Sequence, residues 1–232
     1  MKPKALFLGA IGVLAETSDI QRRAYNQALA EAGLTWHWDR ETYRELLSQP
    51  GGIDRLRRLN DSHDAALNEK TIGIIHARKT ELACEQIISQ GIPLRPGVAD
   101  TIGQALEFGI KVALVTTTYR ANIEAIAEAA GPALRFEAFS AVLTREDCAK
   151  PKPSPDIYFA ALRQLGLDAS DVVAVEDSSA SVASAKAAGL YTIATPGAFT
   201  AGQDFSDADE VLVNLHGYSL LGTPATREQV SG

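Results

Sequence analysis

The stretch Lys4–Thr17, K-A-L-F-L-G-A-I-G-V-L-A-E-T, decides how the rest of the chain is interpreted. Its residues 5–8 form a short apolar run that ends at Gly9, which predicts a buried strand. Gly12 then begins a turn that carries the chain away from the sheet. In α/β proteins ligands bind at such strand ends, so we expect the functional site beside Gly9.

The next 70 residues favour helices only. Ser18 is predicted to be the N-cap of a helix over 19–32, which Gly33 ends. Further helices are predicted over 39–48, 53–59 and 68–89, with a break at 50–52. No convincing strand is found in 17–89, so we expect an all-helical insert there.

From Pro93 onward the pattern alternates between strand and helix. Helices are predicted over 97–108, 121–130, 154–165 and 178–188, and strands over 110–115, 141–143, 172–175, 191–194 and 211–213. This alternation predicts an α/β fold with a doubly wound parallel sheet. We expect residues 1–15 and 92–222 to form this core, 17–89 to form a helical cap, and 223–232 to be a mobile tail.

Composition limits the class of protein. The 232 residues are 46% hydrophobic and 22% charged, as in soluble globular proteins. The net charge of −7 argues against a nucleic-acid partner. No run is long enough to span a membrane, no signal peptide is recognised, and two cysteines without metal-type spacing suggest a reducing compartment. We therefore expect a cytoplasmic protein without membrane contact.

Three predicted strand ends carry polar residues that could act on a ligand. Thr116 and Thr117 follow the second strand, and their hydroxyls could bind a phosphate. Lys152 lies in a proline-rich loop that would hold its ammonium in place for an anion. Glu176 and Asp177 could hold a hard cation such as Mg²⁺. Each also has a plain structural interpretation: a threonine-rich strand end, a surface lysine, and a helix N-cap.

Taken together, these stretches resemble the haloacid dehalogenase (HAD) superfamily, whose Asp-x-Asp-Gly-(Thr/Val)-Leu motif aligns on Gly12-Val13-Leu14. Within it, the chain is most similar to the CbbY-like sugar-phosphate phosphatases, which include xylulose-bisphosphate phosphatases. The stretches that carry this likeness include 14–17, 38–40, 43–47, 51–52 with Arg55, 76–80, 94–98, 116–118, 195–196, 200–202 and 204–205.

The resemblance implies a mechanism that this chain departs from. In such enzymes the first aspartate is the nucleophile, the second is the acid and base, and Mg²⁺ joins the first to the acid of the last motif. Here Gly9 and Ile11 occupy the two aspartate positions. Ile53 replaces a frequent cap lysine, and Ser181 replaces a glycine. The resemblance also places Glu16, Arg55 and Arg78 where cap or hinge residues would meet a substrate, although for arginines on a helix a solvated face is the commoner explanation.

Three functions remain open at this stage. The first is a catalytically degenerate homologue that binds a phosphorylated small molecule through Thr116, Thr117 and Lys152. The second is a divergent active phosphatase on a sugar phosphate, and the third is a protein-interaction module with a vestigial pocket. We expect no cofactor, only weak Mg²⁺ binding at Glu176 and Asp177, pairing of Lys152 with one of these acids, and a monomer.

Overall fold

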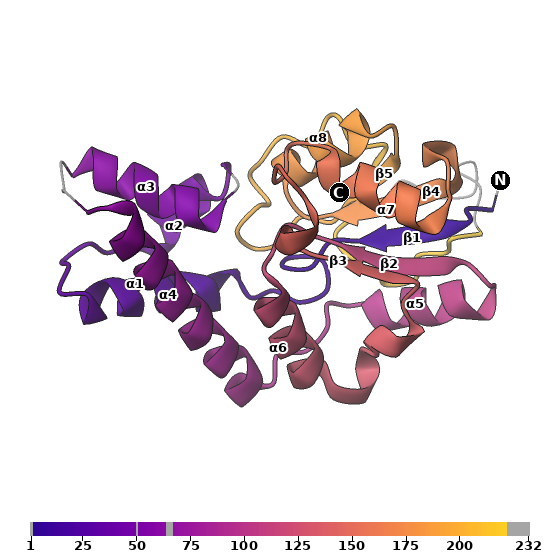
Figure 1. Ribbon diagram of the computed structural model, residues 1–232. Coiled ribbons are helices and arrows are strands. Elements are labelled where there is room, and N and C mark those ends of the chain that lie inside the picture. The colour runs from indigo at the N-terminus through magenta and orange to yellow at the C-terminus, as the bar shows by residue number, and fades with distance from the viewer. Residues whose placement is uncertain (1, 50, 64–66, 222–232) are drawn as a thin grey trace.

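The computed structural model describes residues 2–49, 51–63 and 67–221, and it confirms the α/β fold (Figure 1). Six parallel strands form one sheet in the order β3-β2-β1-β4-β5-β6. The strands are β1 (Ala5–Leu8), β2 (Lys111–Val115), β3 (Ala141–Leu143), β4 (Val172–Glu176), β5 (Tyr191–Ala194) and β6 (Glu210–Val211). The predicted tail 223–232 lies outside the described residues.

The register brings the predicted site residues to one edge of the sheet. Leu8 pairs with Leu114 on one side and with Val175 on the other, so β1, β2 and β4 end side by side. The amide of Gly9 continues the ladder by donating to the Val175 carbonyl at 3.0 Å. Gly9, Thr116 and Glu176 therefore share the carboxyl edge, where parallel sheets bind ligands.

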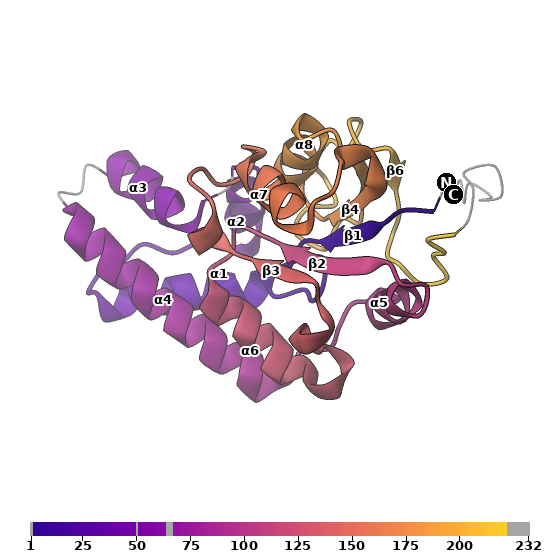
Figure 2. The same ribbon diagram turned by 45° about the vertical axis from the view of Figure 1, so that its right-hand side comes forward.

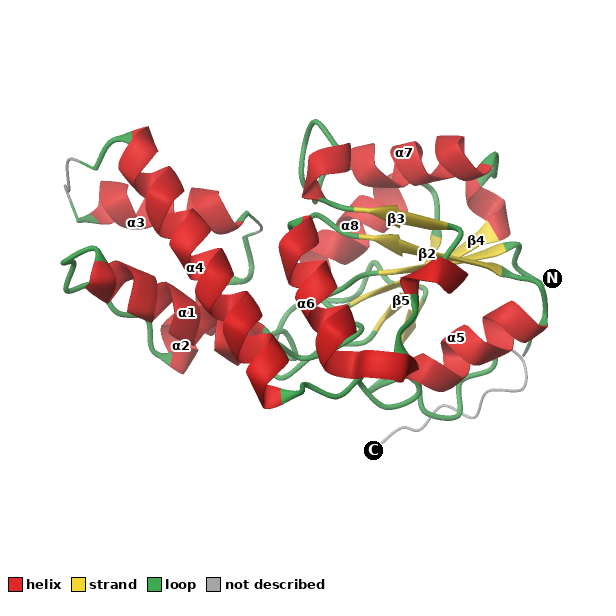
Figure 3. Cartoon of the chain, turned by 60° about the horizontal axis from the view of Figure 1, so that its bottom comes forward, coloured by secondary structure: helices red, strands yellow, loops and turns green. Residues whose placement is uncertain are grey.

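Helices cover both faces of the sheet (Figures 1 and 3). Alternate residues of β1 explain why, since Leu6 and Leu8 pack in one apolar cluster and Ala5 and Phe7 in another. The first cluster includes residues of α5 (Val98–Glu107) and α6 (Arg120–Ala130), and the second includes residues of α7 (Asp156–Leu165) and α8 (Ser179–Ala187). A sheet that is buried on both faces needs such uniformly apolar strands.

Four helices lie to one side of the sheet and are called the cap here (Figure 2). They are α1 (Ser18–Glu31), α2 (Arg40–Leu46), α3 (Gly52–Ser62) and α4 (Glu69–Gln90). In the described part of 17–89 there is no strand. The cap is held by the rings of Tyr25, Trp38 and Tyr43, with Tyr25 and Trp38 at 4.9 Å between centroids. Helix α4 packs against α1 and α6, and thereby joins the cap to the core.

Two local predictions differ from the structure. The prediction of Ser18 as an N-cap is wrong, because α1 begins at Ser18 and Thr17 is the N-cap without a side-chain bond. The Glu16 carboxylate instead accepts from the Ser18 amide at 3.1 Å. The last strand covers 210–211 instead of 211–213. Among the described residues, no helix is both long and apolar enough to cross a membrane.

Candidate functional site: a cavity between sheet and cap

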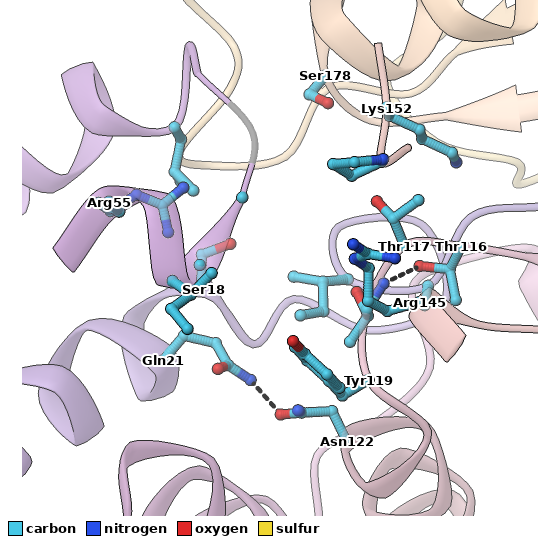
Figure 4. A pocket seen from close by; sticks show the side chains of 18 of the residues that line it. Ser18, Gln21, Arg55, Thr116, Thr117, Tyr119, Asn122, Arg145, Lys152 and Ser178 are labelled. Carbon is cyan, nitrogen blue, oxygen red and sulfur yellow. Dashed lines mark hydrogen bonds between the residues drawn. The ribbon is translucent and has the colours of Figure 1, made fainter. Parts of the chain in front are cut away.

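A cavity of about 470 Å³ lies between the carboxyl edge of the sheet and the cap (Figure 4). Thr116, Thr117, Lys152 and Glu176 line it from the core. Its cap side is lined by residues of α1, α3 and α4, including Arg55 and Lys79. This volume is typical of small-molecule sites.

The two positions that would carry aspartates offer no reactive side chain. Ile11 lines the cavity with an alkyl group. A Cβ built at Gly9 would lie only 2.7 Å from Oε2 of Glu176 and 3.0 Å from Cγ2 of Val13. The space that a larger residue 9 would need is therefore partly filled by the Glu176 carboxylate.

Glu176 and Lys152 form a buried ion pair. Nζ of Lys152 donates to Oε1 of Glu176 at 2.6 Å and to the Val115 carbonyl at 2.9 Å, and both side chains are at most 4% exposed. The Tyr158 hydroxyl also donates to Glu176 Oε1. The predicted pairing of Lys152 with an acid is thus confirmed, and two of the three ammonium donors are used within the protein.

Asp177 lies beside this pair and close to Gly12. Part of its side chain is open to the cavity. Desolvation, followed by the charges of Glu176 and Glu16, raises the pKa of Asp177 to about 8. At neutral pH this carboxyl is therefore largely protonated.

These residues do not fit the Mg²⁺ that the resemblance implies. Gly9 supplies no ligand, and the Glu176 carboxylate is already paired with Lys152. Within residues 2–49, 51–63 and 67–221, no three Asp, Glu, His or Cys side chains are grouped so that they could hold an ion. Mg²⁺ requires charged oxygen ligands in near-octahedral geometry, and this site offers no such set.

Hydroxyl groups form the rest of the core wall. The hydroxyl of Thr116 accepts from the Thr118 amide at 3.1 Å, which fixes the turn after β2. The Thr117 and Ser178 side chains also line the cavity (Figure 4). Ser178 is the N-cap of α8, and its hydroxyl donates to Ser181 at 2.9 Å. Hydroxyls in these positions can donate to an anionic oxygen.

The cap wall carries positive charge without neighbouring acid partners. Arg55 is buried, donates to the carbonyls of Leu46 and Gln49, and lies over the Tyr43 ring. Lys79 is buried, donates to Gln21, and lies over the Tyr25 ring at 4.6 Å. Neither has an ion pair among the described residues. Both therefore line the cavity without an acid that would neutralise them.

Burial controls the protonation of this wall. Desolvation, followed by the charge of Arg55, lowers the pKa of Lys79 to about 7. Desolvation, followed by the charge of Lys79, lowers the pKa of His76 to about 4, so this imidazole is neutral. The one acid of the cap wall, Asp54, is paired with Arg57 at 2.5 Å. An incoming anion would meet no free carboxylate there.

Two residues named from the sequence do not reach the cavity. Arg78 lies on the outer side of α4, where it pairs with Glu31 at 2.8 Å and with Glu81 at 3.1 Å. Glu16 is directed to the linker and to the loop after β5, and accepts from the Ser18 and Ala198 amides. Arg78 is thus a surface residue of the cap, and Glu16 is a hinge contact.

The structure shows a series of hydrogen-bonded polar side chains that was not predicted from the sequence. The Gln21 side chain accepts from Lys79 and donates to Asn122 of α6 at 2.9 Å (Figure 4). All three side chains are buried at the cap–core boundary. The available signal was the i, i+3 spacing of His76 and Lys79, which puts both on one face of α4.

Comparison with known proteins identifies the family to which the chain is similar. Residues 3–189 match the family of haloacid dehalogenase-like hydrolases. Protein CbbY of Rhodobacter capsulatus is 39% identical over 97% of this chain and 99% of its own length. A CBBY-like protein of Arabidopsis thaliana is 37% identical over 96% of this chain and 70% of its own.

Solved structures show the same likeness. A mutant CbbY of Rhodobacter sphaeroides in complex with xylulose 1,5-bisphosphate is 40% identical, with a TM-score of 0.86 over 92% of this chain and 95% of that one. CbbY of the same organism has also been solved in complex with phosphate. A β-phosphoglucomutase of Clostridium difficile shares the fold with a TM-score of 0.77 at 15% identity.

Proposed function

The chain belongs to the haloacid dehalogenase-like hydrolases, and we propose that it is a non-catalytic member that binds a phosphorylated small molecule between its sheet and its cap. The observation that carries the proposal is the distribution of charge in the cavity. On the core side the carboxylates are neutralised, by Lys152 or by a proton. On the cap side Arg55 and Lys79 have no carboxylate partner. The binding of a dianionic phosphate would supply the missing negative charge.

The same arrangement argues against phosphoryl transfer to the protein. Nucleophilic catalysis needs an activated nucleophile next to a base. Gly9 and Ile11 provide neither, and the Glu176 carboxylate is held by Lys152 and Tyr158. Loss of a covalent nucleophile alone costs on the order of 10⁴ to 10⁶ in rate in proteases.

The substrate of the relatives suggests the first ligand to test. A CbbY has been solved with xylulose 1,5-bisphosphate. A bisphosphate can place one phosphate near Thr116 and Thr117 and the other near Arg55 and Lys79. We expect it to bind more tightly than inorganic phosphate, because both walls then contribute.

The experiment combines a binding and an activity measurement on one preparation. Isothermal titration with xylulose 1,5-bisphosphate and with inorganic phosphate gives affinities, and phosphate release with Mg²⁺ present gives turnover. Arg55→Gln is expected to weaken bisphosphate binding by about ten- to a hundredfold, the loss of one charged hydrogen-bond partner. Arg78→Gln is the matched control, since this arginine lies outside the cavity.

The outcomes separate the candidate functions. Tight binding without phosphate release supports the proposal. Sustained Mg²⁺-dependent release of phosphate would contradict it. The proposal would also be contradicted if the bisphosphate, inorganic phosphate and a panel of other sugar phosphates all failed to bind. The cavity would then be vestigial.

One observation favours a second function, a divergent phosphatase. The Asp177 carboxyl lines the cavity and keeps its proton at neutral pH, as a general acid must. A water molecule would then have to be the nucleophile. Asp177→Asn abolishes phosphate release in that case, and leaves a non-catalytic protein unchanged in the same assay.

A further inference from the structure

A second cavity, also of about 470 Å³, opens at the surface of the cap and shares only Arg55 with the sheet-edge cavity. It is formed by α2, α3 and the segment that leads into α2 (Figure 1). The Trp38 side chain is buried in its wall, and Leu46 and Leu59 are partly buried there. These side chains give the cavity an apolar surface of the kind that small-molecule sites use.

Two guanidinium groups line this apolar wall, and neither forms an ion pair with a carboxylate among the described residues. Nη2 of Arg58 is buried and has no hydrogen-bond partner among the described residues. Arg55, which borders both cavities, donates to the main-chain carbonyls of Leu46 and Gln49. Burial, followed by the nearby charge of Arg55, lowers the pKa of Arg58. An uncompensated guanidinium in a partly buried site is unfavourable until an anion joins it.

We propose that this second cavity binds a small organic monoacid, with its apolar body against Trp38 and Leu59 and its carboxylate on Arg58. A carboxylate matches the planar donor fork of arginine, and Arg58 lines this cavity without an ion pair among the described residues. The rim limits the ligand to one negative charge, because Glu45 also lines the cavity and would repel a second. The two cavities share Arg55, whereas Lys79 lines the sheet-edge cavity only and Arg58 lines the second cavity only.

The test uses a matched pair of probes, 3-phenylpropionate and 3-phenylpropionamide, which differ in charge at nearly equal size. Both tryptophans of the chain, Trp36 and Trp38, lie in the cap, and Trp38 lines the cavity. Their fluorescence and their indole NMR signals therefore report binding without a label. The acid is expected to bind at least about tenfold more tightly than the amide, as for one charge-assisted hydrogen bond.

Three variants locate the binding. Arg58→Gln is expected to reduce the preference for the acid to less than about twofold. Arg44→Gln removes an exposed arginine of α2 that lines neither cavity, and is expected to keep the preference. Lys79→Gln removes a cation of the sheet-edge cavity only, and is also expected to keep it.

Equal binding of acid and amide to the wild-type protein would overturn the proposal, as would the absence of any indole response up to the solubility limit of the acid. A preference that survives in Arg58→Gln, or disappears in Lys79→Gln, would overturn it too. If Arg58→Gln does not fold, the comparison of the two probes on the wild-type protein still decides the matter.

Discussion

The two walls of the sheet-edge cavity treat charge in opposite ways. On the core wall, Lys152 and Glu176 are paired at 2.6 Å and Asp177 keeps a proton. On the cap wall, Arg55 and Lys79 are buried without an acid. The charges of the core wall are therefore balanced within the protein, whereas the two basic side chains of the cap wall have no acid partner among the described residues. This difference shows that the two walls of one cavity can balance their charges independently, and it is the observation on which the proposed binding of a phosphate rests.

The largest expected effect comes from breaking the pair on the core wall. Lys152→Met leaves the Glu176 carboxylate buried without its cation, which is expected to lower the free energy of unfolding by about 3 to 5 kcal/mol. Chemical denaturation measures this. Lys186→Met, which breaks the partly exposed pair with Asp209, is the control and should cost less than about 1 kcal/mol. Equal losses of unfolding free energy in the two variants would show that the buried pair of Lys152 and Glu176 contributes no more to stability than the partly exposed pair.

The next effect follows from rebuilding the lost carboxylates. Gly9→Asp combined with Ile11→Asp is expected to lower the free energy of unfolding by about 2 to 4 kcal/mol without metal, through lost apolar burial and repulsion between carboxylates. The structure adds a condition, because a Cβ at position 9 would meet Glu176 Oε2 at 2.7 Å. Glu176 must therefore move away from Gly9, and its contact with Lys152 must adjust.

The check is the melting temperature of this double variant with and without Mg²⁺. A cation that binds the native state only would recover part of the loss. The wild-type protein in the same titration is the control. If Mg²⁺ changes the melting temperature of neither protein, Glu176 has stayed paired with Lys152 and the metal site has not been restored.

A smaller effect distinguishes the walls by pH. The pKa of Lys79 falls from 10.5 to about 7 on folding, so between these values the unfolded chain holds more protons and stability rises with pH. The pKa of Asp177 rises from 3.8 to about 8, so between these values the native protein holds more protons and stability falls with pH. Together they predict a minimum of stability near pH 7 to 8.

Denaturation curves at several pH values test this. Lys79→Met should be more stable than the wild type by about 1 to 3 kcal/mol at pH 7, since it no longer buries a charge. In this variant the free energy of unfolding should also rise less with pH above pH 7. Asp177→Asn should weaken the fall between pH 4 and 8. A wild-type stability that peaks near pH 7, with both variants parallel to it, would contradict the assignment of these two groups.

The sequence was sufficient for the fold because the strands and helices are marked by local patterns. The apolar run 5–8, the turn at Gly12 and the alternation after Pro93 each correspond to an element of the structure. The resemblance also indicated Thr116, Thr117 and Lys152, which the register of β1, β2 and β4 brings to one edge. These residues follow directly from strand ends, so their meeting place could be predicted.

The cap side of the site could not be derived in the same way. Arg55 and Arg78 are both arginines on amphipathic helices, and only the packing of α3 and α4 decides that one faces the cavity and the other the surface. The contacts of Lys79 with Gln21 and of Gln21 with Asn122 join residues 58 and 101 positions apart. No local spacing encodes such contacts. Likewise, the position of Glu176 against Gly9 depends on neighbouring strands, which the sequence alone does not place in atomic detail.

The smallest expected effect concerns Glu16, which joins the two walls without lining the cavity. Its carboxylate accepts from the amides of Ser18 in the linker and Ala198 in the loop after β5. Glu16→Gln keeps the shape but weakens these charge-assisted bonds, with an expected loss of about 1 kcal/mol in the free energy of unfolding.

Because the charge of Glu16 helps to raise the pKa of Asp177, the same variant should lower that pKa. NMR titration of the Asp177 carboxyl measures the shift, and Glu41→Gln on the exposed side of α2 is the control. A loss of stability without any change in the titration of Asp177 would mean that Glu16 acts as a hinge contact alone, and that the two walls are electrostatically independent.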